Sequence, residues 1–160
     1  MKYLKKNKER ILTFFSIMII FAIPVAACTA NESNTSLELG EIPYEFLAEA
    51  DLIERLEIEE LTGDWAKEVQ SRAGKGVLVT YRPEENEPTI FMGVYYFPKA
   101  AFDAAQNPNE PPMFGSEVIR EDGMVLAIAG PHDSIFDPAT TDGKNINRLY
   151  ELIYLPESYR

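Results

Sequence analysis

The sequence predicts an α+β domain, in which helices pack on one face of an antiparallel sheet of about four strands. Two observations support this prediction. Strand-like segments occur as two neighbouring pairs, each joined by a short turn, and do not alternate singly with helices. A strongly amphipathic segment follows the second pair, which disfavours an all-strand sandwich.

The domain begins with a predicted helix over residues 44–55, because Phe46, Ala50 and Ile53 approximate a helical stripe. Pro43 suits the first turn of such a helix. Residues 56–61 alternate apolar and acidic side chains, as a strand does, and their assignment stays open at this point.

The first hairpin is predicted from two strand-like segments, residues 74–83 and 89–98. The second of these strands is apolar on both faces, which is typical of a central strand, or of a strand whose second face is covered by a helix or ligand. A short helix over residues 99–106 and a stiff loop with three prolines over residues 107–115 follow.

The stretch over residues 116–131 predicts the second hairpin, because Asp122-Gly123 is typical of a type I′ turn. The C-terminal segment carries apolar side chains at helical spacing. These residues are Ile146, Leu149, Tyr150 and Ile153. We expect Asn145 or Asp142 to cap the start of this helix and Pro156 to end it.

The N-terminal segment has the layout of an export signal. Residues 2–10 hold five basic side chains, and residues 11–27 form an uncharged, apolar run. The last three residues of this run and Cys28 form the motif "VAAC". Cys28 is the only cysteine of the chain, so no intramolecular disulfide can form. A retained membrane anchor is the alternative, but 17 apolar residues that include Pro24 are short for a membrane-spanning helix.

The "VAAC" motif resembles the lipobox of bacterial lipoproteins, a resemblance that covers roughly the first thirty residues. The resemblance implies that the Cys28 thiol carries a diacylglyceryl group and that a signal peptidase cuts before Cys28. Two or more acyl chains make a membrane anchor stable, whereas one chain binds reversibly. Residues 1–27 are therefore predicted as signal peptide, 28–40 as a flexible tether and 41–160 as a single domain.

The predicted mature chain is strongly acidic. The signal removes five of the fifteen basic residues and one of the twenty-six acidic ones, which leaves ten and twenty-five and a net charge of −15. Such a domain repels nucleic acid and favours a basic partner, which can itself be a membrane protein. The acidic side chains are densest between Glu38 and Glu68, where a solvated surface is the alternative to a docking face.

Residues 129–145 form the loop with the most concentrated functional groups, including His132, the only histidine, and Asp133. These two residues are the candidates for an acid–base pair in a hydrolase, with Ser134 as a nearby hydroxyl. Neighbours in sequence seldom form such a relay, and no G-x-S-x-G motif is present, so we predict no catalytic role.

The sequence offers few residues that could bind a metal ion or a cofactor. Asp137 and Asp142 are the candidates for a calcium site, but their spacing fails the EF-hand pattern, and no metal or cofactor is predicted. Phosphate binding at "GKG" (74–76) is not supported, because the Walker pattern is missing.

Four residues are candidates for contact with a partner: Tyr95, Phe97, Met113 and Phe114. The first two can stack on a ligand or belong to the core, and the last two can lie exposed at a loop tip or tuck under it. Taken together, the sequence predicts a lipid-anchored bacterial lipoprotein outside the cytoplasm with an acidic binding or accessory domain. A cell-envelope hydrolase that uses His132, or a purely structural spacer, is the alternative.

Overall fold

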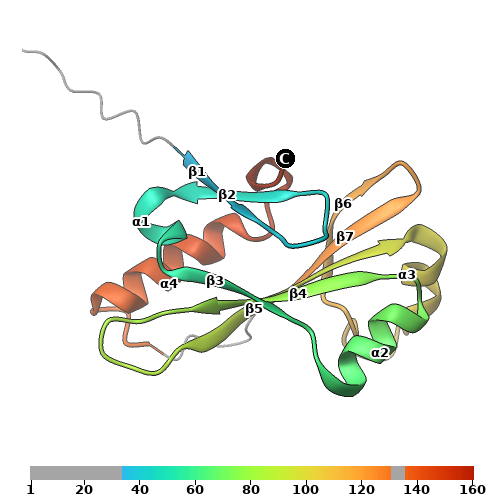
Figure 1. Cartoon of the computed structure of the whole chain (residues 1–160), viewed down its shortest axis with the longest axis horizontal. Coiled ribbons are helices and arrows are strands. Elements are labelled where there is room, and N and C mark those ends of the chain that lie inside the picture. The colour runs from blue at the N-terminus through green and yellow to red at the C-terminus, as the bar shows by residue number, and fades with distance from the viewer. Residues whose placement is uncertain (1–33, 131–135) are drawn as a thin grey trace, which may run out of the picture. The chain divides into compact units, whose positions relative to one another are not determined.

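A five-stranded antiparallel sheet organises the domain (Figure 1). This computed structural model describes residues 34–130 and 136–160, which belong to one unit, Asn31–Arg160. The strands, in spatial order, are β3 (Leu56–Glu60), β4 (Lys75–Tyr81), β5 (Thr89–Pro98), β7 (Met124–Ala129) and β6 (Ser116–Glu121). The α+β class is confirmed, but the sheet has five strands because residues 56–60 pair with β4.

Both predicted hairpins are confirmed. β4 pairs antiparallel with β5, and β6 pairs antiparallel with β7. The turn between β6 and β7 places Asp122 at φ 49° and Gly123 at φ 78°, the positive values that a type I′ turn needs at both positions. β5 is the central strand of the sheet, which accounts for its apolar side chains on both faces.

Helices cover both faces of the sheet, not one face as predicted (Figure 1). The helices are α1 (Ala50–Ile53), α2 (Gly63–Ser71), α3 (Lys99–Ala105), α4 (Thr141–Leu152) and the short 3₁₀ helix η1 (Pro156–Ser158). None of the helices in residues 34–130 and 136–160 has the length and apolar content that a membrane crossing requires.

The first core cluster fills the face of the sheet that carries α4 and a separate two-stranded sheet. This small sheet pairs β1 (Asn34–Glu38) with β2 (Glu45–Glu49). Val79 and Met92 of the large sheet are fully buried here with Phe46 of β2 and Leu149 of α4. Burying such side chains contributes about 1.5–3 kcal/mol each. This cluster therefore holds the small β1–β2 sheet and α4 against the five-stranded sheet.

The second core cluster lies on the opposite face and is rich in aromatic rings. Phe97 and Phe114 are fully buried there, with ring centroids 4.5 Å apart, and Tyr95 is 4% exposed. Gly93 makes room for this cluster, because a Cβ built on it would lie 2.5 Å from the Tyr95 hydroxyl oxygen. Gly74 makes room for the Phe97 ring in the same way, at 2.2 Å.

The helix predicted over residues 44–55 is wrong. Residues 45–49 form β2, and only Ala50–Ile53 is helical. The reason is nonlocal, because β2 pairs along its full length with β1, in a register that joins Ser36 to Leu47. The partner strand comes from the segment predicted as a tether, so the described fold includes Asn34–Glu38, which lie before the predicted boundary at residue 41.

Helix α4 confirms the predicted C-terminal helix, but its cap differs from the prediction. Thr140 precedes the helix in an extended conformation, and its hydroxyl accepts a hydrogen bond from the Gly143 backbone N–H at 3.0 Å. Asn145 and Asp142 therefore lie inside the helix, where both side chains are buried. Pro156 begins η1, four residues after α4 ends.

Candidate functional site

Several of the residues that the sequence singles out lie outside the described part of the chain. Cys28 belongs to residues 1–33, and His132, Asp133 and Ser134 belong to residues 131–135. The lipidation prediction for Cys28 and the acid–base prediction for His132 and Asp133 therefore remain predictions.

Asp142 joins three parts of the fold near the start of α4. Its Oδ1 accepts a hydrogen bond of 2.8 Å from the hydroxyl of Tyr81 at the end of β4, and its Oδ2 accepts one of 3.2 Å from the Glu84 backbone N–H. Asn145 donates a further hydrogen bond to the Tyr81 hydroxyl. Burial, together with the nearby Asp142 carboxylate, raises the pKa of Tyr81 to about 12. The buried carboxylate thus anchors the loop between β4 and β5 to α4.

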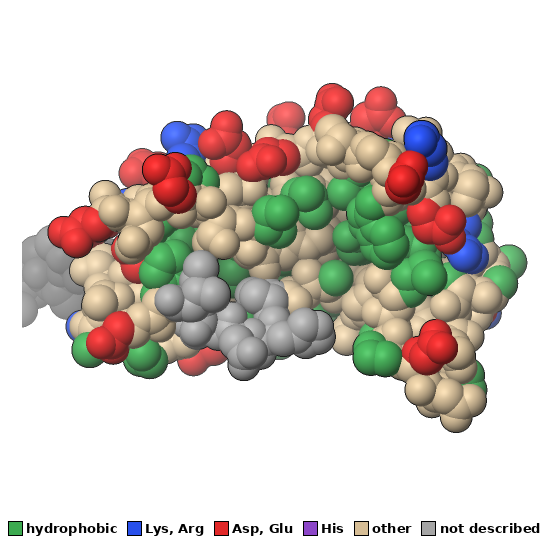
Figure 2. Space-filling view, turned by 90° about the horizontal axis from the view of Figure 1, so that it is seen from below, with side chains coloured by type: hydrophobic (Ala, Val, Ile, Leu, Met, Phe, Trp, Pro, Cys, Tyr) green, Lys and Arg blue, Asp and Glu red, His purple; other side chains and the backbone are tan. Residues whose placement is uncertain are grey.

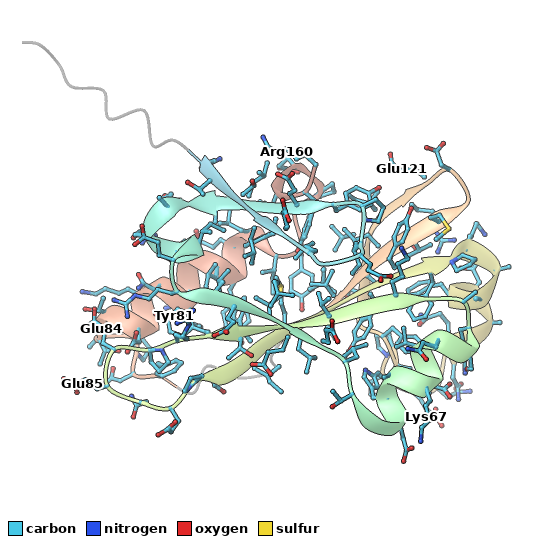
Figure 3. All side chains as sticks on the ribbon, in the orientation of Figure 1. Lys67, Tyr81, Glu84, Glu85, Glu121 and Arg160 are labelled. Atoms are coloured by element: carbon cyan, nitrogen blue, oxygen red, sulfur yellow. The ribbon has the colours of Figure 1, made fainter. Side chains whose placement is uncertain are left out.

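An acidic hollow of about 350 Å³ lies beside Asp142. Its lining comes from Glu84, Glu85 and Asn86 of the β4–β5 loop and from residues 136–142. Figure 3 shows Tyr81, Glu84 and Glu85 gathered at this end of the sheet, opposite the end where Lys67 marks α2. The sequence-predicted pair Asp137 and Asp142 both line this hollow.

The carboxylates of Asp137 and Asp142 both accept hydrogen bonds within the fold. Asp137 accepts a hydrogen bond of 2.8 Å from the Ala139 backbone N–H, in the turn that leads to α4. Within residues 34–130 and 136–160, no group of three or more His, Cys, Asp or Glu side chains is placed to hold a metal ion. The hydrogen bonds of Asp142 support a structural role for this residue.

The aromatic candidates for partner contact belong to the second core cluster. Tyr95, Phe97 and Phe114 are buried there, in agreement with the core alternative considered for them, and present little surface to a partner. Phe114 packs against Phe97, with ring centroids 4.5 Å apart, whereas Met113 stays 47% exposed. Of the four candidates, Met113 alone has an accessible side chain.

A larger hollow, of about 500 Å³, lies at the α2 end of the sheet and is a second candidate binding site. Four segments line it: the β1–β2 turn (40–42), the end of β3 with its exit (58–61), α2 (66–70) and the start of β4 (74–77). We call it the α2 hollow. Its size lies within the range of about 300–1,000 Å³ that ligand sites usually have.

The charged side chains of the α2 hollow are Glu41, Glu60 and Lys75. The Lys75 ammonium donates a hydrogen bond of 2.9 Å to the Glu41 backbone oxygen and lies 3.7 Å from the Glu41 carboxylate. Glu60 is exposed and forms no ion pair with another described residue. The pairing of Glu41 with Lys75 leaves the Glu60 carboxylate as the uncompensated charge of the hollow.

Trp65, the only tryptophan of the chain, belongs to α2. Its indole N–H donates a hydrogen bond of 2.9 Å to the Tyr95 hydroxyl, and its ring is 37% exposed. Burial raises the pKa of Tyr95, while the hydrogen bond from Trp65 acts in the opposite direction. The indole also packs against the rings of Tyr95 and Phe114, with centroids 6.1 Å and 5.3 Å apart.

Exposed apolar surface and acidic groups occur together on the α2 side of the sheet. Figure 2 shows this side, with hydrophobic side chains along a hollowed band and acidic side chains on its upper rim. Ile90, which is 57% exposed, and Trp65 are among the large hydrophobic residues that stay accessible on the domain. Such a combination suits a partner that carries both basic and apolar side chains.

The α2 hollow was not predicted from the sequence, because its lining comes from four separate segments. One signal was available in the "GKG" segment, where Gly74 and Gly76 flank Lys75. A Cβ on Gly76 would lie 2.6 Å from a Leu61 methyl carbon and 2.9 Å from the Tyr95 ring. The two glycines therefore leave room for the side chains of Phe97, Leu61 and Tyr95.

Comparison with known proteins yields no matching family model, no similar curated protein and no similar solved structure.

Proposed function

We propose that this chain is a bacterial lipoprotein, anchored to the outer side of a membrane through acyl chains on Cys28, and that its acidic domain binds a partner or supports a neighbouring complex. The observation that carries the proposal is the "VAAC" motif that ends an uncharged run after a basic N-terminus. The short distance from Cys28 to the fold and the charge of the domain support it further.

The distance along the chain between Cys28 and the fold is short. Strand β1 begins at Asn34, six residues after Cys28. An extended chain covers at most about 3.3–3.6 Å per residue, so the start of β1 stays within roughly 20 Å of the anchored cysteine. The proposed anchor would therefore hold the domain at the membrane surface, where it meets membrane proteins and other surface-bound partners.

The charge of the domain favours a basic partner. The chain from Cys28 onward has a net charge of −15, which repels nucleic acid and anionic headgroups and attracts cationic segments. The α2 hollow offers an accessible place for such a segment, with Glu60 on its rim. No catalytic role is proposed, because His132 and Asp133 are neighbours in sequence and the chain has no G-x-S-x-G motif.

The anchor is tested by replacing Cys28→Ser and growing the cells with radiolabelled palmitate. We expect the wild-type chain to carry the label and sediment with membranes, and the variant to lose the label and keep residues 1–27. Thr29→Ser serves as the matched control and should label normally. A Cys28→Ser chain that still takes up the label would overturn the proposal.

A further inference from the structure

Strand β3 forms one edge of the five-stranded sheet, next to β4 (Figure 1). Neighbouring residues of such a strand turn their backbone groups to opposite sides. The hydrogen bond of 2.8 Å from the Arg82 N–H to the Arg55 oxygen shows that Arg55 faces β4, and every second residue after it does the same. The backbone groups of Leu56, Ile58 and Glu60 therefore point away from β4, toward the outer edge of the sheet.

The outer edge of β3 is unpaired among the residues described. None of them forms a main-chain hydrogen bond with the outward groups of Leu56, Ile58 or Glu60. Leu56 is buried, whereas Ile58 is half-buried and Glu60 is exposed, so the accessible part of the edge covers residues 58–60. An unpaired strand edge is a template on which another extended chain can pair.

The side chains along β3 select the charge of an added strand. Glu57 and Glu59 point to one face of the sheet, and Ile58 points to the other, where it packs against the first core cluster. Arg82 offsets Glu57 at 3.1 Å, but Glu59 and Glu60 form no ion pair with a described residue. A strand with a basic side chain beside Glu59 and an apolar one beside Ile58 would complement this edge.

A second copy of this chain fits the edge poorly. If two β3 strands paired antiparallel about Ile58, Glu57 of one copy would lie opposite Glu59 of the other. Like charges directly opposite each other in a sheet are destabilising. The same carboxylates attract a cationic segment, and the net charge of −15 from Cys28 onward would speed its approach.

We propose that the outer edge of β3 binds an extended segment of a protein partner in which basic and apolar side chains alternate. The segment adds a sixth strand to the sheet and bonds to the backbone groups of Ile58 and Glu60. Strand addition of this kind draws affinity from main-chain hydrogen bonds and selectivity from alternate side chains. The inference names the partner class for the proposed binding function and rests on that function for its biological setting only.

The test uses the full chain, purified from membranes in detergent, and a model peptide, acetyl-Lys-Val-Lys-Val-Lys-amide. Calorimetry should show saturable binding that weakens as salt is raised, because the charges become screened. The charge-reversed peptide acetyl-Glu-Val-Glu-Val-Glu-amide should not bind.

Amide hydrogen exchange, followed by NMR, locates the bound peptide. With free peptide at about ten times its Kd, exchange of the Ile58 and Glu60 amides should slow about tenfold, because they exchange only when the peptide has left. The outward amides of β6, the other edge strand of the sheet, should exchange at their former rates.

Matched variants separate this edge from the general acidity of the domain. Glu59→Gln keeps an oxygen that accepts the hydrogen bond from the Thr80 hydroxyl, and it should weaken binding about two- to fivefold, as expected for one exposed ion pair. Glu87→Gln removes the same charge from the exposed β4–β5 loop and should leave the affinity unchanged.

A second pair of variants tests the backbone of β3. Glu60→Pro and Glu60→Gln remove the same charge, but only the proline also removes the outward N–H. Proline is tolerated on an edge strand where that N–H faces solvent. Glu60→Pro should therefore bind about three- to tenfold more weakly than Glu60→Gln, the value of one main-chain hydrogen bond.

Two methylated peptides test the strand pairing without any change to the protein. One is methylated on the backbone nitrogen of the central lysine and the other on that of the valine after it. Alternate N–H groups of an added strand point to β3, so only one of the two should bind about three- to tenfold more weakly than the parent peptide.

The proposal is overturned if the basic peptide does not bind, if Glu59→Gln and Glu87→Gln act alike, or if the two methylated peptides bind alike. Light scattering should report a monomer without peptide. A dimer in which the Ile58 and Glu60 amides are protected would assign the edge to a second copy and also overturn the proposal. Palmitate labelling of Cys28 is measured separately, so the anchor can stand when this inference fails.

Discussion

The hydroxyl of Tyr81 donates a hydrogen bond to the Asp142 carboxylate over 2.8 Å, and thereby ties the end of β4 to the first turn of α4. The Glu84 backbone N–H uses the second oxygen of the same carboxylate. Asp142 is 7% exposed, so water replaces these partners poorly. Asp142, a candidate calcium ligand from its sequence, thus connects β4, the β4–β5 loop and α4 through these hydrogen bonds.

Replacing Asp142→Ala should therefore destabilise the domain. The change leaves the Tyr81 hydroxyl and the Glu84 N–H without an acceptor, and we expect a loss of about 1.5–3 kcal/mol in the free energy of unfolding, measured in urea. Asp64→Ala is the matched control, because Asp64 is exposed and pairs only with Lys67, so its loss should stay within about 0.5 kcal/mol. An equal loss in the free energy of unfolding for the two variants would contradict the structural role of Asp142.

The same contact predicts how stability depends on alkaline pH. Burial above all raises the folded-state pKa of Tyr81 from its ordinary value of 10.0 to about 12. Between these values the unfolded chain releases the proton while the folded chain keeps it, so this stabilisation is complete below about pH 10 and is lost as the pH rises toward 12. Burial also raises the pKa of Tyr159, which acts in the same direction.

Urea unfolding between pH 9 and 12 checks this expectation. The free energy of unfolding should fall steeply over that interval in the wild-type chain and less steeply in Tyr81→Phe, which has no proton to lose at this site. Identical slopes for the two chains would show that Tyr81 does not titrate as described.

Adjacent residues of the Pro-rich loop provide a sharp comparison. Phe114 is fully buried against Phe97, whereas Met113 is 47% exposed. Phe114→Ala should cost about 3–5 kcal/mol, because it leaves a cavity in the second core cluster. Met113→Ala should change the free energy of unfolding by no more than about 0.5 kcal/mol. Similar losses for Phe114→Ala and Met113→Ala would mean that Phe114 is not buried in the second core cluster.

Local signals predicted the elements whose partners are near in sequence. The hairpin over residues 116–129 follows from Asp122-Gly123, and β5 follows from a long run of apolar residues. The same reasoning failed for residues 45–49, because their strand partner is the polar segment Asn34–Glu38, which has no strand signal of its own. Tertiary pairing overrode the helical stripe that Phe46, Ala50 and Ile53 suggest.

Helix α2 and the α2 hollow were missed for related reasons. α2 is nine residues long and buries only Val69, so its apolar stripe is too short to stand out. The hollow exists because β3 ends two residues short of the start of β4, and strand lengths cannot be read with that accuracy from composition. For Asp142, the sequence located the residue correctly, but its bond to Tyr81 joins positions too far apart to be foreseen.

The glycine in the centre of β5 yields a further prediction. Gly93→Ala places a methyl group within 2.8 Å of three atoms of the Tyr95 side chain and should destabilise the domain by about 1–3 kcal/mol. The cost should shrink when Tyr95 is first replaced by alanine, because the clashing ring is then gone. A double-mutant cycle by thermal unfolding measures this coupling, and purely additive effects would assign the cost of Gly93→Ala to another cause.

The central claim is that Cys28 becomes the acylated first residue of the mature protein, which places an acidic binding domain at a membrane surface. Mass spectrometry of the N-terminal peptide from the membrane-extracted protein tests this most directly. The account predicts a peptide that begins at Cys28 and carries the added mass of a diacylglyceryl group, with or without a further acyl chain on its amine. An N-terminal peptide that contains residues before Cys28, or an unmodified Cys28, would contradict it.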